Sequence, residues 1–298
     1  MTDATINTYQ GLRPYLFSVA YRFTGSASDA EDLVHDAWVR YLAAGSPPVD
    51  SLRAYLTTIV SRLSLDYLKS ARVRREEYLG PWLPEPILTA EDVSDPALAV
   101  ERQETVSMAL LTLLDRLTPD QRIVYVLRES LGLGFDEIAD HLGRTAASCR
   151  QLFRRARQQL AASDHFPAQR PEPDLTRRFL VALSTASVPD LVEILAEDVV
   201  WLSDGGPHRT AARNPIHGRD RVSRGLAGIV RRFGDESTRV TPAQLNGEPG
   251  LILWRANGIS SVVQWSTSNG AITHLWFSRN PQKLAHVARQ LGATIAPA

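Results

Sequence analysis

The sequence predicts a multi-domain chain in which two all-α domains, a helical bundle and a helix-turn-helix, are followed by an α+β domain. The 298 residues exceed the roughly 100–200 residues that one domain usually contains. Apolar residues recur at helical spacing up to about residue 163, and short apolar runs bounded by Gly, Asn and Pro follow. Proline-rich stretches lie where the pattern changes. We therefore expect domains at 1–76, 99–163 and 174–298, joined by linkers at 77–98 and 164–173.

The composition is that of a globular protein and excludes several classes. Apolar residues make up 44% and charged residues 22%, so each domain can bury a core. The 33 basic and 33 acidic residues balance, so any attraction to nucleic acid must be local. One cysteine excludes an internal disulfide framework and a multi-cysteine metal site. Because the N-terminus lacks a signal-peptide pattern and no apolar run approaches the ~18 residues of a membrane span, we expect a cytoplasmic protein without a membrane partner.

Three helices are expected in the first domain. The first has apolar residues at helical spacing from Leu12 to Phe23 and ends at Gly25. The second opens at Ser28, which can form a capping box with Glu31. The third runs from about Ser51 and ends among arginines. After the linker, helices are expected over 95–117 and 123–131.

The charges of this part are segregated along the chain. The segment 29–36 contains four acidic residues and no Lys or Arg, whereas the segment 62–75 contains five basic residues against Asp66 alone. A charge run is usually only the solvated face of a helix, and that alternative remains open for each run taken alone.

Residues 135–160 predict a helix-turn-helix. Phe135 to Gly143 reads as a short helix ending in a glycine that permits a tight turn, and a second helix follows from Thr145 to Leu160. The second helix has an apolar face containing Cys149, which we expect to fill the core, and a polar, cationic face without acids. In this motif the second helix faces the DNA major groove; the alternative is a helical hairpin with a solvated basic face. The candidate DNA contacts are Arg144, Thr145, Ser148, Arg150, Gln151, Arg154, Arg155 and Arg157.

The last domain is predicted from short helices and strands. Helices are expected at Leu175–Leu183 and Val188–Leu195, and strands at 199–202, 251–254, 261–265 and 271–277. Two helices followed by a strand-rich half indicate an α+β domain.

Strand alternation puts Ile272, His274 and Trp276 on one face of their strand, and Val263 and Trp265 on one face of the preceding strand. A histidine beside tryptophans can act as a general base, with Asp204 or His217 as its partner, but a core histidine is the favoured alternative. The sequence contains no nucleophile elbow, phosphate loop or metal-ligand cluster, so we expect no catalytic residue, no metal, no cofactor and no enzyme activity.

Two motifs in the helical part resemble a known family. Tyr21 to Ser26, followed by Asp29 to Trp38, resembles region 2 of extracytoplasmic-function sigma factors, the group IV members of the sigma-70 family of RNA polymerase subunits. Leu63 to Arg75 resembles the end of that region, and Leu117 to Leu160 resembles region 4. The resemblance covers about the first 163 residues.

The resemblance implies that the protein binds core RNA polymerase and promoter DNA. The acidic helix is then expected to dock on polymerase through Asp29, Glu31, Asp32, His35, Asp36 and Trp38. The basic helix end is expected to hold the opened −10 strand through Arg62, Asp66, Lys69, Arg72, Arg74 and Arg75. Tyr55 and Tyr67 can stack on bases there, although their spacing favours core positions. The helix-turn-helix is expected to bind the −35 element as duplex.

A narrower resemblance links three distant segments. Residues 82–86 (Trp-Leu-Pro-Glu-Pro), 204–206 (Asp-Gly-Gly) and 280–284 (Asn-Pro-Gln-Lys-Leu) look like the sigma-factor subfamily that carries a SnoaL-like domain, a cone-shaped fold shared with nuclear transport factor 2. The resemblance implies that this domain regulates the sigma domains in cis, and we expect the segments to meet. The contact residues are then Trp82, Leu83, Pro84, Glu85, Pro86, Asp204, Gly205, Gly206, Asn280, Pro281, Lys283 and Leu284.

The sequence departs from these relatives at two places. Pro207-His208 stands where the subfamily usually has Gly-Lys, and Ser61-Arg62 stands where many sigma factors have Arg-Asn. A second function class also remains: a helix-turn-helix regulator that binds DNA without polymerase and whose cone domain senses a small ligand or acts as an enzyme.

Overall fold

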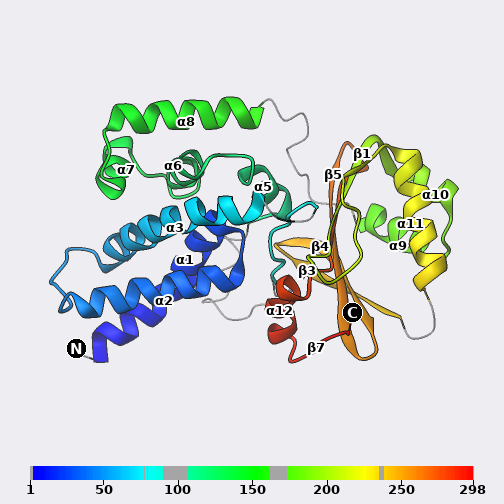
Figure 1. Cartoon of the computed structure of the whole chain (residues 1–298), viewed down its shortest axis with the longest axis horizontal. Coiled ribbons are helices and arrows are strands. Elements are labelled where there is room, and N and C mark those ends of the chain that lie inside the picture. Colours follow the sequence, from blue (N-terminus) through cyan, green and yellow to red (C-terminus); the bar gives the residue numbers. More distant parts are fainter. Residues whose placement is uncertain are drawn as a thin grey trace. The chain divides into compact units, whose positions relative to one another are not determined.

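The computed structural model describes residues 3–76, 78, 80–89, 106–161, 173–234 and 238–297 (Figure 1). The chain divides into two compact units. Of the described residues, 3–76, 106 and 110–161 belong to the helical unit, and 78, 80–89, 107–109, 173–234 and 238–297 belong to the sheet unit. No helix within the described ranges is long and apolar enough to cross a membrane.

The helical unit begins with three packed helices, α1 (Asp3–Thr24), α2 (Ala27–Ala43) and α3 (Leu52–Glu76). Helix α1 ends as predicted, because Gly25 adopts a φ of 69° that a glycine tolerates without strain. The prediction that Ser28 caps α2 is wrong. Ser26 has the extended backbone of an N-cap, and its Oγ accepts the N–H of Asp29 at 3.2 Å.

Four further helices follow in the chain: α5 (Met108–Leu114), α6 (Pro119–Glu129), α7 (Phe135–Leu142) and α8 (Ala146–Ala161). They belong to the helical unit, except that the first two residues of α5 belong to the sheet unit. Thr118 and Gln121 form a capping box that starts α6. Gly143 has a φ of 63° and turns the chain from α7 into α8, so these two helices have the predicted helix-turn-helix order. The part of the expected 95–117 helix before residue 106 lies outside the described residues.

The sheet unit contains a mixed sheet with the strand order β2-β1-β6-β5-β4-β3. Its strands are β1 (Leu195–Asp204), β2 (Ile216–His217), β3 (Arg239–Leu245), β4 (Glu248–Arg255), β5 (Gly258–Ser268), β6 (Ala271–Ser278) and β7 (Thr294–Ile295). Strand β1 runs parallel to β6, β7 pairs in parallel with β5, and the other neighbours are antiparallel. The helices of this unit are α9 (Pro173–Ser184), α10 (Val188–Ile194), α11 (Arg219–Phe233) and α12 (Pro281–Gln290).

The two faces of this sheet bury different partners. One face joins α9, α10 and α11 in an aromatic core in which Phe179 contacts Trp265 and Trp201 contacts Phe277, with ring centroids 5.0 and 4.9 Å apart. The other face is covered by α12 and by the linker residue Leu83, which packs on Trp276. The linker is therefore part of the core of the sheet unit.

A register shift between Ser266 and Thr267 corrects one predicted face. Ile272 lies in the aromatic core, whereas Trp276 lies on the linker-covered side, so these two residues do not share a face. An irregularity of this kind reverses the direction of the side chains that follow it. The predicted pairing of Val263 with Trp265 on one face is confirmed, because both belong to the aromatic core.

Candidate functional site

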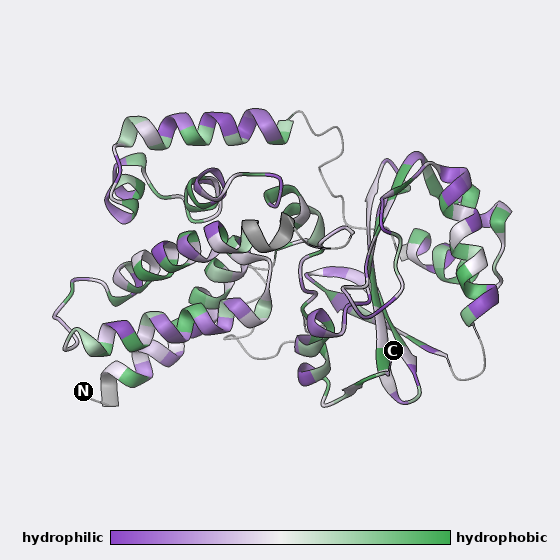
Figure 2. Cartoon of the chain, in the orientation of Figure 1, coloured by the Kyte–Doolittle hydropathy of each residue, from purple (hydrophilic) through white to green (hydrophobic). Residues whose placement is uncertain are grey.

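The outer face of α8 carries the predicted duplex-binding residues. Arg150, Gln151, Arg154, Arg155 and Arg157 are exposed, and Figure 2 shows α8 as largely hydrophilic. No acidic residue interrupts this surface. The helix therefore presents guanidinium and amide groups that can bond phosphates and base edges.

Two residues predicted to contact the duplex have structural roles at the start of α8. Thr145 Oγ1 accepts the N–H of Ser148 at 3.2 Å and caps the helix. Arg144 is half-buried and forms an ion pair with Asp120 of α6, with 2.5 Å between Nη2 and Oδ1. Since its guanidinium is already engaged, Arg144 is placed to hold α8 against α6.

Aromatic packing holds α8 on its two neighbouring helices. Phe153 contacts Tyr125 of α6 and Phe135 of α7, with centroid distances of 6.0 and 5.6 Å. Cys149 and Ala156 are fully buried on the same face. Burial raises the pKa of the Cys149 thiol, as expected for a core cysteine rather than a reactive one.

The predicted −10 surface lies along α3. Arg62, Asp66 and Lys69 are exposed and recur at helical spacing, so they share one face of the helix. Arg62 Nε donates to the carbonyl of His141 at 2.7 Å, and its Nη2 donates to the carbonyl of Asp140 at 3.2 Å. The side chains of the remaining predicted residues, Arg72, Arg74 and Arg75, lie outside the described residues.

The acidic helix α2 presents part of its predicted polymerase surface to solvent. Asp32, His35 and Asp36 are exposed, whereas Asp29, Glu31 and Trp38 are half-buried. Trp38 stacks on Tyr9 of α1 with ring centroids 4.1 Å apart. Asp29 accepts the hydroxyl proton of Tyr67 at 2.6 Å, which gives that tyrosine a structural role. Tyr55 likewise packs edge-on against Tyr41.

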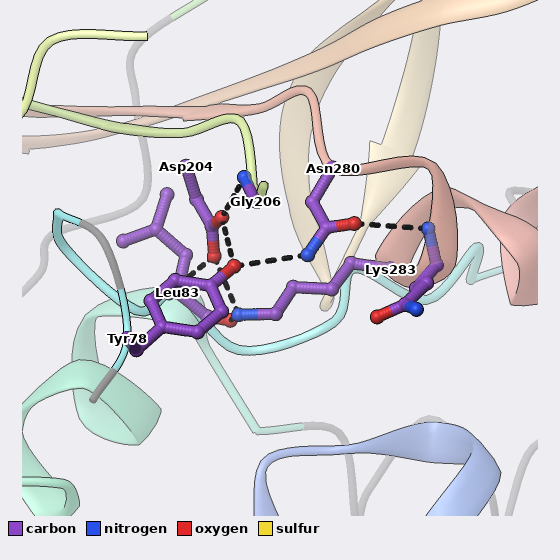
Figure 3. Close-up of polar contacts among 7 residues, drawn as sticks. Tyr78, Leu83, Asp204, Gly206, Asn280 and Lys283 are labelled. Carbon is purple, nitrogen blue, oxygen red and sulfur yellow. Dashed lines mark hydrogen bonds and ion pairs between the residues drawn. The ribbon is translucent and has the colours of Figure 1, made fainter. Parts of the chain in front are cut away.

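The three segments expected to meet around the linker are brought together in the sheet unit (Figure 3). Asp204, at the end of β1, is the centre of this contact and is 1% exposed. Its Oδ1 accepts the Tyr78 hydroxyl at 2.5 Å and the Gly206 N–H at 3.0 Å. Its Oδ2 accepts the Leu83 N–H at 2.9 Å and lies 2.5 Å from Lys283 Nζ. We call these five residues, together with Trp82 and Asn280, the linker clamp.

Lys283 holds the linker from the other side. Its ammonium also donates to the Leu83 carbonyl and lies 4.0 Å from the centroid of the Trp82 ring and 5.2 Å from that of Tyr78. The buried cation is thus satisfied by a carboxylate, a carbonyl and two aromatic faces. Burial and the neighbouring Asp204 raise the pKa of Tyr78, which keeps its hydroxyl a donor.

Asn280 connects the clamp to α12. Its Oδ1 accepts the Gln282 N–H at 3.0 Å and caps the helix that carries Lys283, while its Nδ2 donates to the Tyr78 hydroxyl at 2.9 Å. Pro281 occupies the first turn of this helix. The other predicted contact residues, Pro84, Glu85, Pro86 and Leu284, are buried.

Geometry explains the two glycines that follow Asp204. A Cβ on Gly205 would lie 2.1 Å from the Arg209 carbonyl oxygen. Gly206 has a φ of 59°, and a Cβ there would lie 2.6 Å from Asn280 Cγ. The backbone after β1 approaches its neighbours too closely for any side chain.

A second contact of the linker was missed by sequence reasoning. Asn246 and Gly247 form a tight turn between β3 and β4 with positive φ values, and this turn bonds linker residues 87–89. Leu88 also bonds the side chain of Gln290 in α12 at 2.9 Å. The Asn-Gly dipeptide is a hairpin signal, but nothing local marks it as a docking site.

The proposed acid–base arrangement around His274 is not formed. His274 stacks on Trp276 with centroids 5.7 Å apart, on the side of the sheet that the linker covers. Asp204 is engaged by the linker clamp, and His217 is exposed on β2. His274 is therefore a buried residue of the packed interior.

Comparison with known proteins identifies the class of the helical unit. Residues 8–74 match the family Sigma-70 region 2, and residues 107–160 match Sigma-70, region 4. Proteins that combine these regions are transcription initiation factors rather than enzymes.

Relatives along nearly the whole chain narrow this class. The ECF RNA polymerase sigma factor SigJ of Mycobacterium tuberculosis (strain ATCC 25618 / H37Rv) is 36% identical over 289 residues, which cover 93% of this chain and 92% of that protein. The probable ECF RNA polymerase sigma factor SigI of the same strain is 32% identical over 300 residues, with 97% and 98% covered. The chain therefore belongs to the extracytoplasmic-function (ECF) family of RNA polymerase sigma factors.

A solved structure agrees with this membership. The crystal structure of M. tuberculosis SigJ is similar with a TM-score of 0.76 and 34% identity, covering 94% of this chain and 98% of that one. The predicted fold class, helical sigma domains followed by an α+β domain, is confirmed. Of the two function classes that the sequence left open, the sigma factor is the correct one.

Proposed function

We propose that this sigma factor selects promoters through α8 and α3 and is regulated in cis by its C-terminal domain, which holds the linker through the linker clamp. The exposed basic face of α8 supports duplex binding at the −35 element. The exposed polar face of α3 supports capture of the opened −10 strand. The acidic face of α2 supports docking on core RNA polymerase.

The regulatory proposal rests on the buried Asp204–Lys283 pair. Linker residues 78–89 follow region 2 in the chain and precede region 4, so a domain that holds them shortens the free connection between the two regions. Both partners are nearly inaccessible, at 1% and 5% exposure, and both bond the backbone of Leu83. The sheet unit thereby restrains the linker, and release of the linker is expected to raise promoter output.

Removal of one member of the pair tests this regulation. Asp204→Asn keeps the size of the side chain but leaves the Lys283 ammonium without its counter-charge, which costs ~3–5 kcal/mol for a buried pair. Lys283→Met in the same chain removes the orphaned charge and should restore folding stability without restoring the linker contact. Run-off transcription with core RNA polymerase should show higher output for Asp204→Asn and for the double variant than for the unmodified chain.

Asp220→Asn is the matched control. Asp220 forms an exposed ion pair with Arg224 on α11 of the same unit, with 3.5 Å between the charged atoms, and such pairs contribute ~1 kcal/mol or less. This variant should transcribe like the unmodified chain. Equal output from the clamp variants and the control would reject regulation by the clamp, and lower output would show that the clamp supports initiation instead.

A further inference from the structure

Two half-buried arginines of the sheet unit meet at the loop that follows β1. Arg209 donates its backbone N–H to the carbonyl of Gly205 at 3.1 Å. Arg279 donates its backbone N–H to the carbonyl of Asp204 at 2.7 Å. The Arg279 guanidinium reaches back to the carbonyl of Thr210, the neighbour of Arg209, at 2.5 Å. Main-chain and side-chain bonds therefore attach both arginines to one short loop.

Backbone carbonyls orient the two guanidinium groups. Arg209 donates through Nη1 to the carbonyl of Ser260 and through Nη2 to the carbonyl of Ala296. Its Nε is buried and has no hydrogen-bond partner among the described residues. Each guanidinium has five N–H groups, of which Arg209 uses two and Arg279 uses one. Most of the donors of this pair therefore have no acceptor in the described part of the chain.

The positive charges of this pair repel each other. Burial and the charge of Arg279 lower the pKa of Arg209, and burial and the charge of Arg255 lower the pKa of Arg279. Within the described ranges, neither Arg209 nor Arg279 forms an ion pair with a carboxylate, and Asp204 is already paired with Lys283. One arginine bonded to carbonyls is an ordinary structural contact, whereas two adjacent charges cost stability that a bound anion would restore.

The donors indicate the class of anion. A guanidinium binds phosphate oxygens through parallel N–H donors, and two such groups suit the multiple charges of a phosphate ester or diphosphate better than the single charge of a carboxylate. Helix α12 begins directly after Arg279, so the positive end of its dipole lies beside this arginine.

We propose that Arg209 and Arg279 form a binding site for a small phosphate-bearing molecule at the loop 204–210. The same loop supplies Asp204 and Gly206 to the linker clamp, so the bound anion would contact the segment that holds the linker. An effect of the anion on the linker rests on the proposed function, whereas the site itself does not.

Isothermal titration calorimetry of the full-length protein with sodium pyrophosphate tests the site. At constant ionic strength, the unmodified chain should bind pyrophosphate more tightly than inorganic phosphate, because pyrophosphate carries more negative charge. Arg279→Gln should weaken pyrophosphate binding by about tenfold, as expected for the loss of one charged hydrogen-bonding group. Arg209→Gln should do the same. If Arg209→Gln does not fold, Arg279→Gln still decides the question, since it removes a single carbonyl contact.

Arg221→Gln is the matched control. Arg221 is exposed in the first turn of α11, and its replacement changes the net charge of the sheet unit by the same amount. This variant should bind pyrophosphate like the unmodified chain, because general attraction between the protein and an anion depends on net charge and not on one loop.

The outcomes separate the possible ligands. Weaker pyrophosphate binding by Arg279→Gln alone, with unchanged circular dichroism and Tm, supports the site. Absence of binding to the unmodified chain at millimolar pyrophosphate, or equal weakening by Arg221→Gln, would overturn it. If a single-stranded oligonucleotide loses affinity in Arg279→Gln while pyrophosphate does not bind, the arginines contact a nucleic-acid backbone and the small-molecule site is rejected. Because polymerase is absent from the assay, each result leaves the promoter and clamp proposals unchanged.

Discussion

Glu248 gives the sheet unit a pH dependence that one substitution should remove. This residue opens β4 directly after the Asn246–Gly247 turn that bonds the linker, and it is 7% exposed. Its Oε2 is buried without a hydrogen-bond partner among the described residues. Burial raises the pKa of this carboxyl from 4.5 to about 7.

The folded and unfolded states bind the Glu248 proton with different affinities, and this difference sets the sign and size of the change in stability with pH. Because the folded state holds the proton more tightly than the unfolded state, stability is lost as the pH rises from 4.5 through 7. A difference of 2.5 pKa units corresponds to about 3 kcal/mol once the carboxyl is ionised, of which about 2 kcal/mol falls between pH 5.5 and 8.5. The side chain introduced by Glu248→Gln stays neutral at every pH. The free energy of unfolding of this variant should therefore vary by about 2 kcal/mol less between pH 5.5 and 8.5 than that of the unmodified chain.

Tryptophan fluorescence during urea unfolding is a suitable assay. Of the six tryptophans, five lie in the sheet unit: Trp82, Trp201, Trp254, Trp265 and Trp276. The signal therefore reports mainly on this unit. Glu197→Gln is the control, because Glu197 is exposed on β1 and its replacement should leave the pH dependence as it is. If Glu248→Gln keeps the full pH dependence of the unmodified chain, the buried carboxyl is not its source.

Three further predictions concern other parts of the chain. Burial lowers the pKa of His141 below 6.5, so the helical unit should lose stability as the pH falls through and below 6.5. His141→Gln should reduce this loss, measured as the fall of the thermal unfolding temperature with pH. Gly206→Ala should push Asn280 aside and raise transcription, whereas Gly270→Ala, with a φ of 73° and no neighbour within 4 Å, should cost stability alone. Arg154→Gln should lower the salt slope of holoenzyme binding to duplex promoter by ~0.9 if Arg154 contacts phosphate; an unchanged slope with relaxed base preference would assign it to a base edge.

Helical periodicity predicted those helices whose buried and exposed faces can be read from the residues of the helix itself. The faces of α8 could be assigned because one side of that helix is apolar and the other is cationic over four turns. Helix α11 was not predicted, since Gly225 and Gly228 lower the helical propensity of the segment. Gly225 is needed there because a Cβ would lie 2.8 Å from Cζ3 of Trp201, a tertiary contact that the sequence does not reveal.

Strand β3 was missed for a related reason. Pro242 lies in the middle of this strand, and a proline normally argues against a central strand. The structure places β3 at the edge of the sheet, where one side of the backbone needs no strand partner. Edge position is a property of the assembled sheet, so the local sequence was misleading.

The linker clamp was anticipated in most of its residues but not in its depth. Resemblance indicated that Asp204, Lys283 and the linker meet, whereas Tyr78 was missed because a lone linker tyrosine carries no signal of its own. The burial of Asp204 depends on strands β1 and β6 ending side by side in parallel, with Asp204 opposite Ser278. That arrangement joins segments more than 70 residues apart in the chain.

The linker-covered face of the sheet makes release of the linker costly for the core of this unit. Helices α9, α10 and α11 cover only the aromatic face, so Trp276 on the opposite face is buried by Leu83 of the linker and by Met108 and Ala109. Release of the linker would expose Leu83 and Trp276, each worth roughly 1.5–3 kcal/mol of burial, in addition to the unpaired charges of the clamp. Since native domains are stable by only about 5–15 kcal/mol, spontaneous release is rare. The proposed regulation therefore requires a competing partner for that face or for the linker. Neutralising Asp204 alone would leave the apolar contact between Leu83 and Trp276 in place. A Leu83→Ala, Asp204→Asn double variant should therefore release the linker more fully than Asp204→Asn alone. Faster proteolysis of the linker in the double variant would show this release.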